Sequence, residues 1–63
     1  MATVAEIIRK IKKESNCYFL RDGANHEIWY NPDTKRKFQI PRHQSKEVAN
    51  GTVNKIYKDA GLR

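Results

Sequence analysis

The sequence predicts a small α+β domain of order α-β-β-β-α, in which a three-stranded antiparallel sheet carries both helices on one face. Apolar residues recur with helical spacing near both ends of the chain, and the middle alternates short aromatic-rich runs with turn residues. The connections between these runs are too short for crossovers, so the strands are expected to be antiparallel. Because the chain has 63 residues, we expect one domain that spans residues 1–63.

The first helix is expected to open at Thr3, because Glu6 stands three residues later, as in a capping box. Its apolar residues follow the i, i+3, i+4, i+7 spacing of one helix face and are Val4, Ile7, Ile8 and Ile11. Ser15 and Asn16 are expected to end the helix, since their short polar side chains compete for backbone hydrogen bonds.

The strands are expected at residues 17–21, 26–30 and 35–40. Residues 22–25 form the first turn of this prediction, because Gly23 and Asn25 both tolerate positive φ. Residues 31–34 form the second turn, where a proline presets φ. Pro41 closes the third strand, since it cannot donate a ladder hydrogen bond.

A polar loop over residues 42–48 leads to the second helix, for which Asn50 is the predicted N-cap. The apolar stripe of this helix repeats the spacing of the first and consists of Val53, Ile56, Tyr57 and Ala60. Gly61 is expected at the position where a C′ glycine ends a helix, with Leu62 folding back on it. Both stripes must then be buried against one face of the sheet.

The composition favours a cytoplasmic protein that binds a polyanion. Thirteen Lys and Arg against seven Asp and Glu give a net charge of +6, and nucleic acid is the first partner that such a charge suggests. The sequence has no apolar run long enough to span a membrane, and charged residues interrupt its first fifteen positions, unlike a signal peptide. The single cysteine, Cys17, cannot form an internal disulfide.

The sequence offers few residues for catalysis. It contains no phosphate-binding glycine loop and no pair of histidines with metal-ligand spacing, so we expect neither a metal nor a cofactor. Cys17 begins an apolar strand and is interpreted as a core residue. His26 follows a flexible turn at the head of a strand, on the same side as Ile28 and Tyr30. From spacing alone, His26 and His43 are each more typical of ordinary surface residues.

Basic residues gather at residues 9–13, at residues 35–37, and at Arg42 with Lys46. Each cluster is as consistent with a solvent-exposed surface that binds nothing as with a phosphate-binding surface. The second and third clusters lie at opposite ends of the third predicted strand. We predict that Arg42, with Lys37 or His43, contacts phosphate.

A wider pattern runs through the chain. Its segments are Gly23–Ala24–Asn25–His26–Glu27–Ile28–Trp29–Tyr30–Asn31–Pro32, Ile40–Pro41–Arg42–His43, Lys46–Glu47, Gly51–Thr52 and Ala60–Gly61–Leu62. In order and spacing, these segments resemble the HicA (YcfA-like) family of bacterial and archaeal toxins. The resemblance covers nearly the whole chain and implies a fold like the double-stranded-RNA-binding domain.

The resemblance also implies a metal-independent endoribonuclease, an mRNA interferase, that is silenced by a cognate HicB-type antitoxin. The catalytic residue of the family is a histidine just after a glycine turn, and His26 holds that position. The commonest family turn is Gly-Ser-His, whereas residues 23–26 follow a longer Gly-Ser-Asn-His form with Ala in place of Ser. The implied partners are mRNA and the antitoxin, with no membrane, and with DNA reached only through the antitoxin complex. The expected RNA contacts are Gly23, Asn25, Lys37, Arg42 and His43.

One histidine and several cations suffice for this chemistry. RNA carries its own nucleophile, the 2′-hydroxyl, so the enzyme need only move a proton and stabilise charge on the phosphorus. We expect His26 to act as general base or acid, and DNA not to be cut. The inhibitor is expected to cover the cleft around His26 and exposed apolar surface such as Trp29 or Tyr18.

Two alternative interpretations give the chain a function other than RNA cleavage. The first is a non-catalytic RNA-binding module of the same fold, which should carry a basic patch at the start of its last helix. The first cation of that helix here is Lys55, which argues mildly against this alternative. The second is a protein-interaction or DNA-binding accessory protein, which only the charge and the thin core support.

Overall fold

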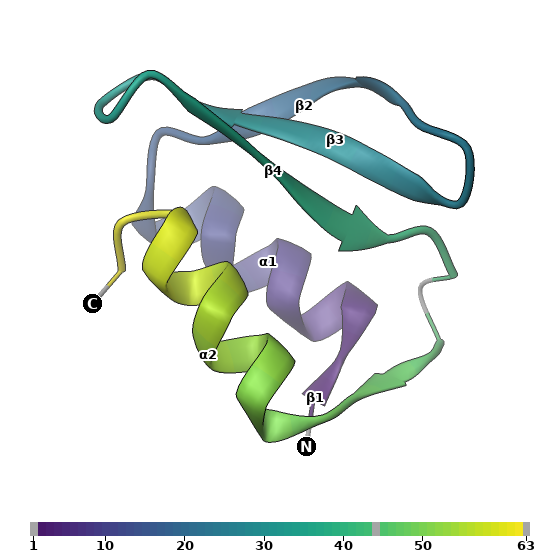
Figure 1. The fold of residues 1–63 in the computed structure, drawn as a ribbon. Helices are drawn as coiled ribbons and strands as arrows, with labels where there is room; N and C mark the ends of the chain where they lie inside the picture. The colour runs from purple at the N-terminus through teal and green to yellow at the C-terminus, as the bar shows by residue number, and fades with distance from the viewer. Residues whose placement is uncertain (1, 44, 63) are drawn as a thin grey trace.

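A computed structural model describes residues 2–43 and 45–62, so residue 44 of the predicted loop 42–48 lies outside the described residues. The elements are β1 (Ala2–Thr3), α1 (Val4–Glu14), β2 (Tyr18–Asp22), β3 (His26–Asn31), β4 (Arg36–Pro41), β5 (Glu47–Val48) and α2 (Asn50–Asp59). Strands β2, β3 and β4 form an antiparallel sheet in that order, and both helices lie on one face of it (Figure 1). The predicted order α-β-β-β-α is therefore confirmed.

Helix α1 begins and ends where the sequence predicts. The Thr3 backbone N–H donates to Glu6 Oε1 at 2.8 Å, and the Glu6 N–H donates to Thr3 Oγ1 at 3.3 Å, which completes the capping box. At the other end, the Ser15 N–H and hydroxyl both donate to the carbonyl of Ile11. The predicted stripe of α1 is buried in the core.

A two-stranded sheet without a signal in the sequence joins the start of α1 to the segment before α2. Ala2 pairs with Val48 and Thr3 pairs with Glu47, inside what was expected to be a loop. The Val4 N–H also donates to the Lys46 carbonyl at 2.9 Å. Two-residue strands are too short to give a readable alternation, so no period marks them in the sequence.

The core lies between the helices and one face of the three-stranded sheet. Trp29 of β3 pairs with Phe38 of β4, and both are buried there with Ile40. Trp29 is only 2% exposed, so the expectation that it offers apolar surface to an inhibitor is wrong, whereas Tyr18 is 47% exposed. Cys17 is buried and donates to the Ala60 carbonyl, as expected of a core cysteine.

Helix α2 differs from the prediction at its start and agrees with it at its end. Ala49 is the N-cap and makes no side-chain cap bond, so Asn50 is the first helical residue and not the predicted cap. At the C-terminus, Gly61 has φ of +83°, and the N–H groups of Gly61 and Leu62 donate to the Lys58 and Tyr57 carbonyls. This is a Schellman motif, with the predicted glycine at C′.

A buried asparagine holds the turn between β3 and β4. Asn31 is 1% exposed, and its Oδ1 accepts from the N–H groups of Asp33 at 2.9 Å and Thr34 at 3.4 Å. Its Nδ2 donates to the Asp59 carbonyl at 3.0 Å, which ties this turn to the end of α2. The predicted turn is confirmed, although Lys35 takes a positive φ of 58° and the strand begins one residue later than expected.

Candidate functional site

The turn between β2 and β3 places His26 at the first position of β3, opposite Pro41 at the end of β4. The Gly23 N–H donates to the His26 carbonyl at 2.7 Å and closes the turn tightly. A Cβ on Gly23 would lie 3.0 Å from that carbonyl oxygen, which is too close. The close approach of the chain therefore favours glycine here, and neither Gly23 nor Asn25 adopts the positive φ that both tolerate.

Arg42 holds this turn from the side. It follows β4 directly, and its Nη2 donates to the Gly23 carbonyl and lies 3.9 Å from Asp22 Oδ1. The pairing of His26 with Pro41 explains the contact, because it brings the end of β4 next to the start of β3. The half-buried His26 is thus fixed through its backbone, while its side chain stays accessible.

Two hollows meet at His26. The first is formed by the turn and by the chain after β4, and its lining residues are Asn25, His26, Pro41, Arg42, His43 and Lys46. It brings together His26 and three of the predicted RNA contacts. It also includes Lys46, which belongs to the third basic cluster but is not among the predicted contacts. The only sequence signal for Lys46 is its position four residues after Arg42.

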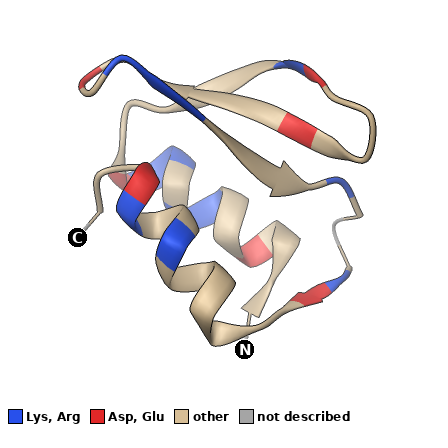
Figure 2. Ribbon diagram, viewed as in Figure 1, with Lys and Arg blue, Asp and Glu red and all other residues tan. Residues whose placement is uncertain are grey.

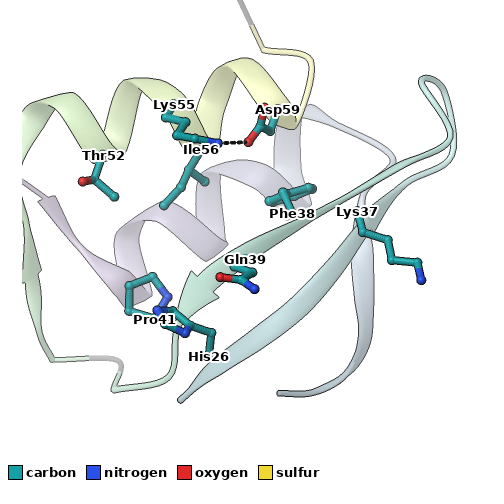
Figure 3. A pocket seen from close by; sticks show the side chains of 9 residues that line it. All are labelled: His26, Lys37, Phe38, Gln39, Pro41, Thr52, Lys55, Ile56 and Asp59. Atoms are coloured by element: carbon teal, nitrogen blue, oxygen red, sulfur yellow. Dashed lines mark hydrogen bonds and ion pairs between the residues drawn. The ribbon is translucent and has the colours of Figure 1, made fainter. Parts of the chain in front are cut away.

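The second hollow is a groove of about 420 Å³ between β4 and α2. Figure 3 shows its lining residues: His26, Lys37, Phe38, Gln39, Pro41, Thr52, Lys55, Ile56 and Asp59. Within this groove Lys55 pairs with Asp59 at 3.1 Å, and Lys37 extends away from α2 (Figure 3). Lys37 lies at the far end of β4 from Arg42, and the five-residue separation corresponds to about 17 Å along the strand.

Positive charge lies at both ends of β4, as Figure 2 shows, with Arg36 and Lys37 at its start and Arg42 after its end. The acidic Glu27 of β3 faces the helix side, where its Oε1 accepts from Trp29 Nε1 at 3.0 Å. The hollow formed by the turn and the chain after β4 is lined by Arg42 and Lys46 beside His26 and by no acidic residue, which suits an anionic ligand.

A family model described as the HicA toxin of bacterial toxin-antitoxin matches residues 4–62. The chain belongs to the HicA toxin family. The match covers both helices and the three-stranded sheet, together with the turn that carries His26. No curated protein matches the chain.

Membership in the HicA family makes the chain a toxin of a toxin–antitoxin pair, and so one that has an antitoxin as its partner. In the described part of this HicA chain, no group of three or more His, Cys, Asp or Glu is placed to hold a metal ion. Neither of its two described helices is long and apolar enough to cross a membrane.

Proposed function

We propose that this HicA family member is a metal-independent endoribonuclease that cuts mRNA with His26 as its single catalytic histidine. The observation that carries the proposal is the position of His26 where two cation-lined hollows meet. A strand and a closed turn fix its backbone, and the side chain stays accessible. A catalytic group needs this combination of rigid placement and access.

The reaction follows from the chemistry of RNA. The 2′-hydroxyl attacks the adjacent phosphorus, so that a 2′-O–P bond forms and the P–O5′ bond breaks. His26 takes the 2′-hydroxyl proton as base or gives a proton to the leaving 5′-oxygen as acid. The products are a 2′,3′-cyclic phosphate and a 5′-hydroxyl. General acid–base catalysis of this kind contributes about 10²–10⁴-fold to the rate.

The residues around His26 supply the phosphate contacts. His43 and Arg42 share its hollow, and Lys37 lies on the groove at the other end of β4. An arginine has five N–H donors, so Arg42 can hold the Gly23 carbonyl with one and a phosphate oxygen with others. Asn25 lines the same hollow from the turn, and Gly23 belongs to that turn although it does not line the hollow; we expect both to contact the RNA backbone.

The partner that holds this toxin inactive is a HicB-type antitoxin. It covers the hollows around His26 and so excludes mRNA, and both proteins act in the cytoplasm. The exposed Tyr18, at the far end of the sheet from His26, adds apolar surface for contact.

The test is cleavage of an oligonucleotide that carries one ribonucleotide among 2′-deoxy positions. Wild type should cut only after the ribonucleotide and leave a cyclic phosphate, and chelators should not change the rate. His26→Ala should lose at least 10²-fold in rate while it binds the oligonucleotide nearly as well. His43→Ala removes the other imidazole of the same hollow, a proposed phosphate contact, and should weaken binding of the oligonucleotide more than it slows single-turnover cleavage.

Cleavage elsewhere than at the ribonucleotide would contradict the 2′-hydroxyl mechanism. Equal rates for wild type and His26→Ala would remove the catalytic role of His26. If neither protein cuts but both bind RNA, the non-catalytic RNA-binding module is the correct alternative. Induction of both proteins in a bacterial host should give growth arrest and mRNA cleavage with wild type alone.

A further inference from the structure

The face of the sheet opposite the helices is open (Figure 1). Strand pairing places two rows of side chains across it. The first row is Tyr18 of β2, Tyr30 of β3 and Lys37 of β4. The second row is Arg21, Ile28 and Gln39. His26 lies on the same face, two residues beyond Ile28 on β3.

A pair of aromatic rings occupies the first row. The ring centroids of Tyr18 and Tyr30 are 5.6 Å apart at an interplanar angle of 55°, and Tyr18 is 47% exposed. Flat rings on the open face of a sheet are the surfaces on which sheet-based RNA-binding modules stack unpaired bases. The bases of a duplex are already stacked in the helix and cannot use such rings.

The charges of this face match a nucleic acid strand. Arg21 on β2 and Lys37 on β4 lie on either side of the central strand, and none of the described positions of the two rows is acidic. Glu27, on the same strand as Tyr30, points instead to the helix side. An aromatic surface between two cations offers ring contacts to a base and ionic contacts to the phosphates beside it.

A β-bulge in β2 decides on which face of the sheet Arg21 lies. The register of β2 against β3 shifts between Phe19 and Arg21, so that Leu20 is the extra residue. Phe19 pairs with Trp29 on the helix side, and strict alternation would put Arg21 on that side too. The bulge moves Arg21 across to pair with Ile28 on the open face. The open face thus gains a cation that a regular strand would direct elsewhere.

We propose that this open face is a stacking platform for single-stranded RNA, in which Tyr18 and Tyr30 take an unpaired base while Arg21 and Lys37 hold the phosphates beside it. The proposal rests on the proposed ribonuclease function, because His26 is then the cutting group at the end of the same strand. Tyr30 is about 13 Å from His26 along β3, so the stacked base lies upstream or downstream of the cleaved phosphate. The platform therefore selects unpaired RNA and sets where it is cut.

The test uses His26→Ala, which binds without cutting, and a fluorescent single-stranded RNA with its matched duplex as competitor. The leucine pair, a double variant with Tyr18→Leu and Tyr30→Leu, keeps apolar bulk but removes both rings. It should weaken single-strand binding about tenfold or more. Phe19→Leu is the matched control, because Phe19 is equally exposed at 46% but lies on the helix side. It should bind as the parent does, and so should Tyr18→Phe with Tyr30→Phe, which keeps the rings.

The cations are tested by salt dependence. Arg21→Gln and Lys37→Gln should each reduce the slope of log K against log salt by about 0.7, the value for one phosphate contact of a single strand. Lys58→Gln on α2 is the control and should leave the slope unchanged. Thermal unfolding followed by circular dichroism shows which variants are folded. If the leucine pair unfolds, Tyr18→Leu alone removes the exposed ring and should still weaken single-strand binding.

Several outcomes would overturn the platform. These are equal loss of binding in the Phe19 and tyrosine variants, binding of duplex as tight as that of single strand, or tyrosine variants that bind RNA normally but escape the antitoxin. In otherwise wild-type protein, the leucine pair should raise KM and leave kcat nearly unchanged. An unchanged KM would refute the stacking platform but not the proposed ribonuclease function. Ring-dependent binding without any cleavage would refute the ribonuclease function but not the platform.

Discussion

The two turns at the ends of β3 are built in opposite ways. The turn after β3 is held from inside by Asn31, a buried side chain that bonds both the turn and the end of α2. The turn before β3 is held from outside by Arg42, an exposed side chain that bonds the Gly23 carbonyl. Both turns are tight and each borders a hollow, but the hollow beside the turn before β3 is the one that contains His26.

Under the proposed function, this difference separates stability from catalysis along a single strand. A buried polar side chain whose oxygen and nitrogen are both hydrogen-bonded is costly to disturb, so the Asn31 end anchors the sheet to the helices. The exposed end can change its side chains at little cost in folding free energy, and it carries His26. The first prediction below compares the two ends directly, and the next two test what holds the exposed end.

The largest effect is expected at the buried end. Asn31→Ala should lower the free energy of unfolding by about 2–3 kcal/mol, because it leaves the Asp59 carbonyl and turn N–H groups without partners. Asn25→Ala, the amide of the exposed turn, should change it by less than about 0.5 kcal/mol. Urea unfolding measures both. Equal losses would show that the two turns are not built differently.

An intermediate effect is expected from Gly23→Ala. The new Cβ would press on the His26 carbonyl and on the Ile28 side chain, so the turn must shift and move His26. We expect a loss of about 1–2 kcal/mol in stability and at least about tenfold in cleavage rate. Gly51→Ala in α2 is the control, since no atom lies within 4 Å of its Cβ. It should stabilise the protein by about 0.5 kcal/mol and leave cleavage unchanged.

The smallest effect is expected from Arg42→Lys. The substitution keeps the charge but replaces the guanidinium fork that reaches the Gly23 carbonyl. Stability should change by less than about 0.5 kcal/mol, because Arg42 is exposed. Single-turnover cleavage should slow about threefold, since the turn that holds His26 loses a contact. An unchanged rate would mean that Arg42 contributes charge alone.

The sequence predicted the elements of the fold because their signals are periodic or local. The stripe of α1 and its capping box are examples, as is the glycine at the end of α2. The buried face of β3 could not be predicted in this way. Ile28 and Tyr30 alternate with Trp29, so both faces of the strand are apolar in sequence, and only the packing of the helices decides which one is buried.

Part of the candidate site could be predicted, because its residues lie in turns and strand ends that have local signals in the sequence. Asn25, Arg42 and His43 do lie beside His26, because the turn and the chain after β4 meet at one end of the sheet. Lys37 lies at the other end of β4, as its place in the third predicted strand already indicates. The bulge at Leu20, which puts Arg21 on the open face, could not be predicted, because it depends on strand register, a property of the pairing and not of either strand alone.

The bulge in β2 has a second consequence, for self-association. β2 is an edge strand whose Tyr18, Phe19 and Leu20 are all large, apolar and at least 40% exposed. A regular strand of this kind is a template on which a second copy can add its own edge and start a growing aggregate. The extra residue breaks the even spacing of N–H and C=O groups that such pairing requires. The irregularity therefore protects the free toxin from polymerising through its own sheet whenever its inhibitor is absent.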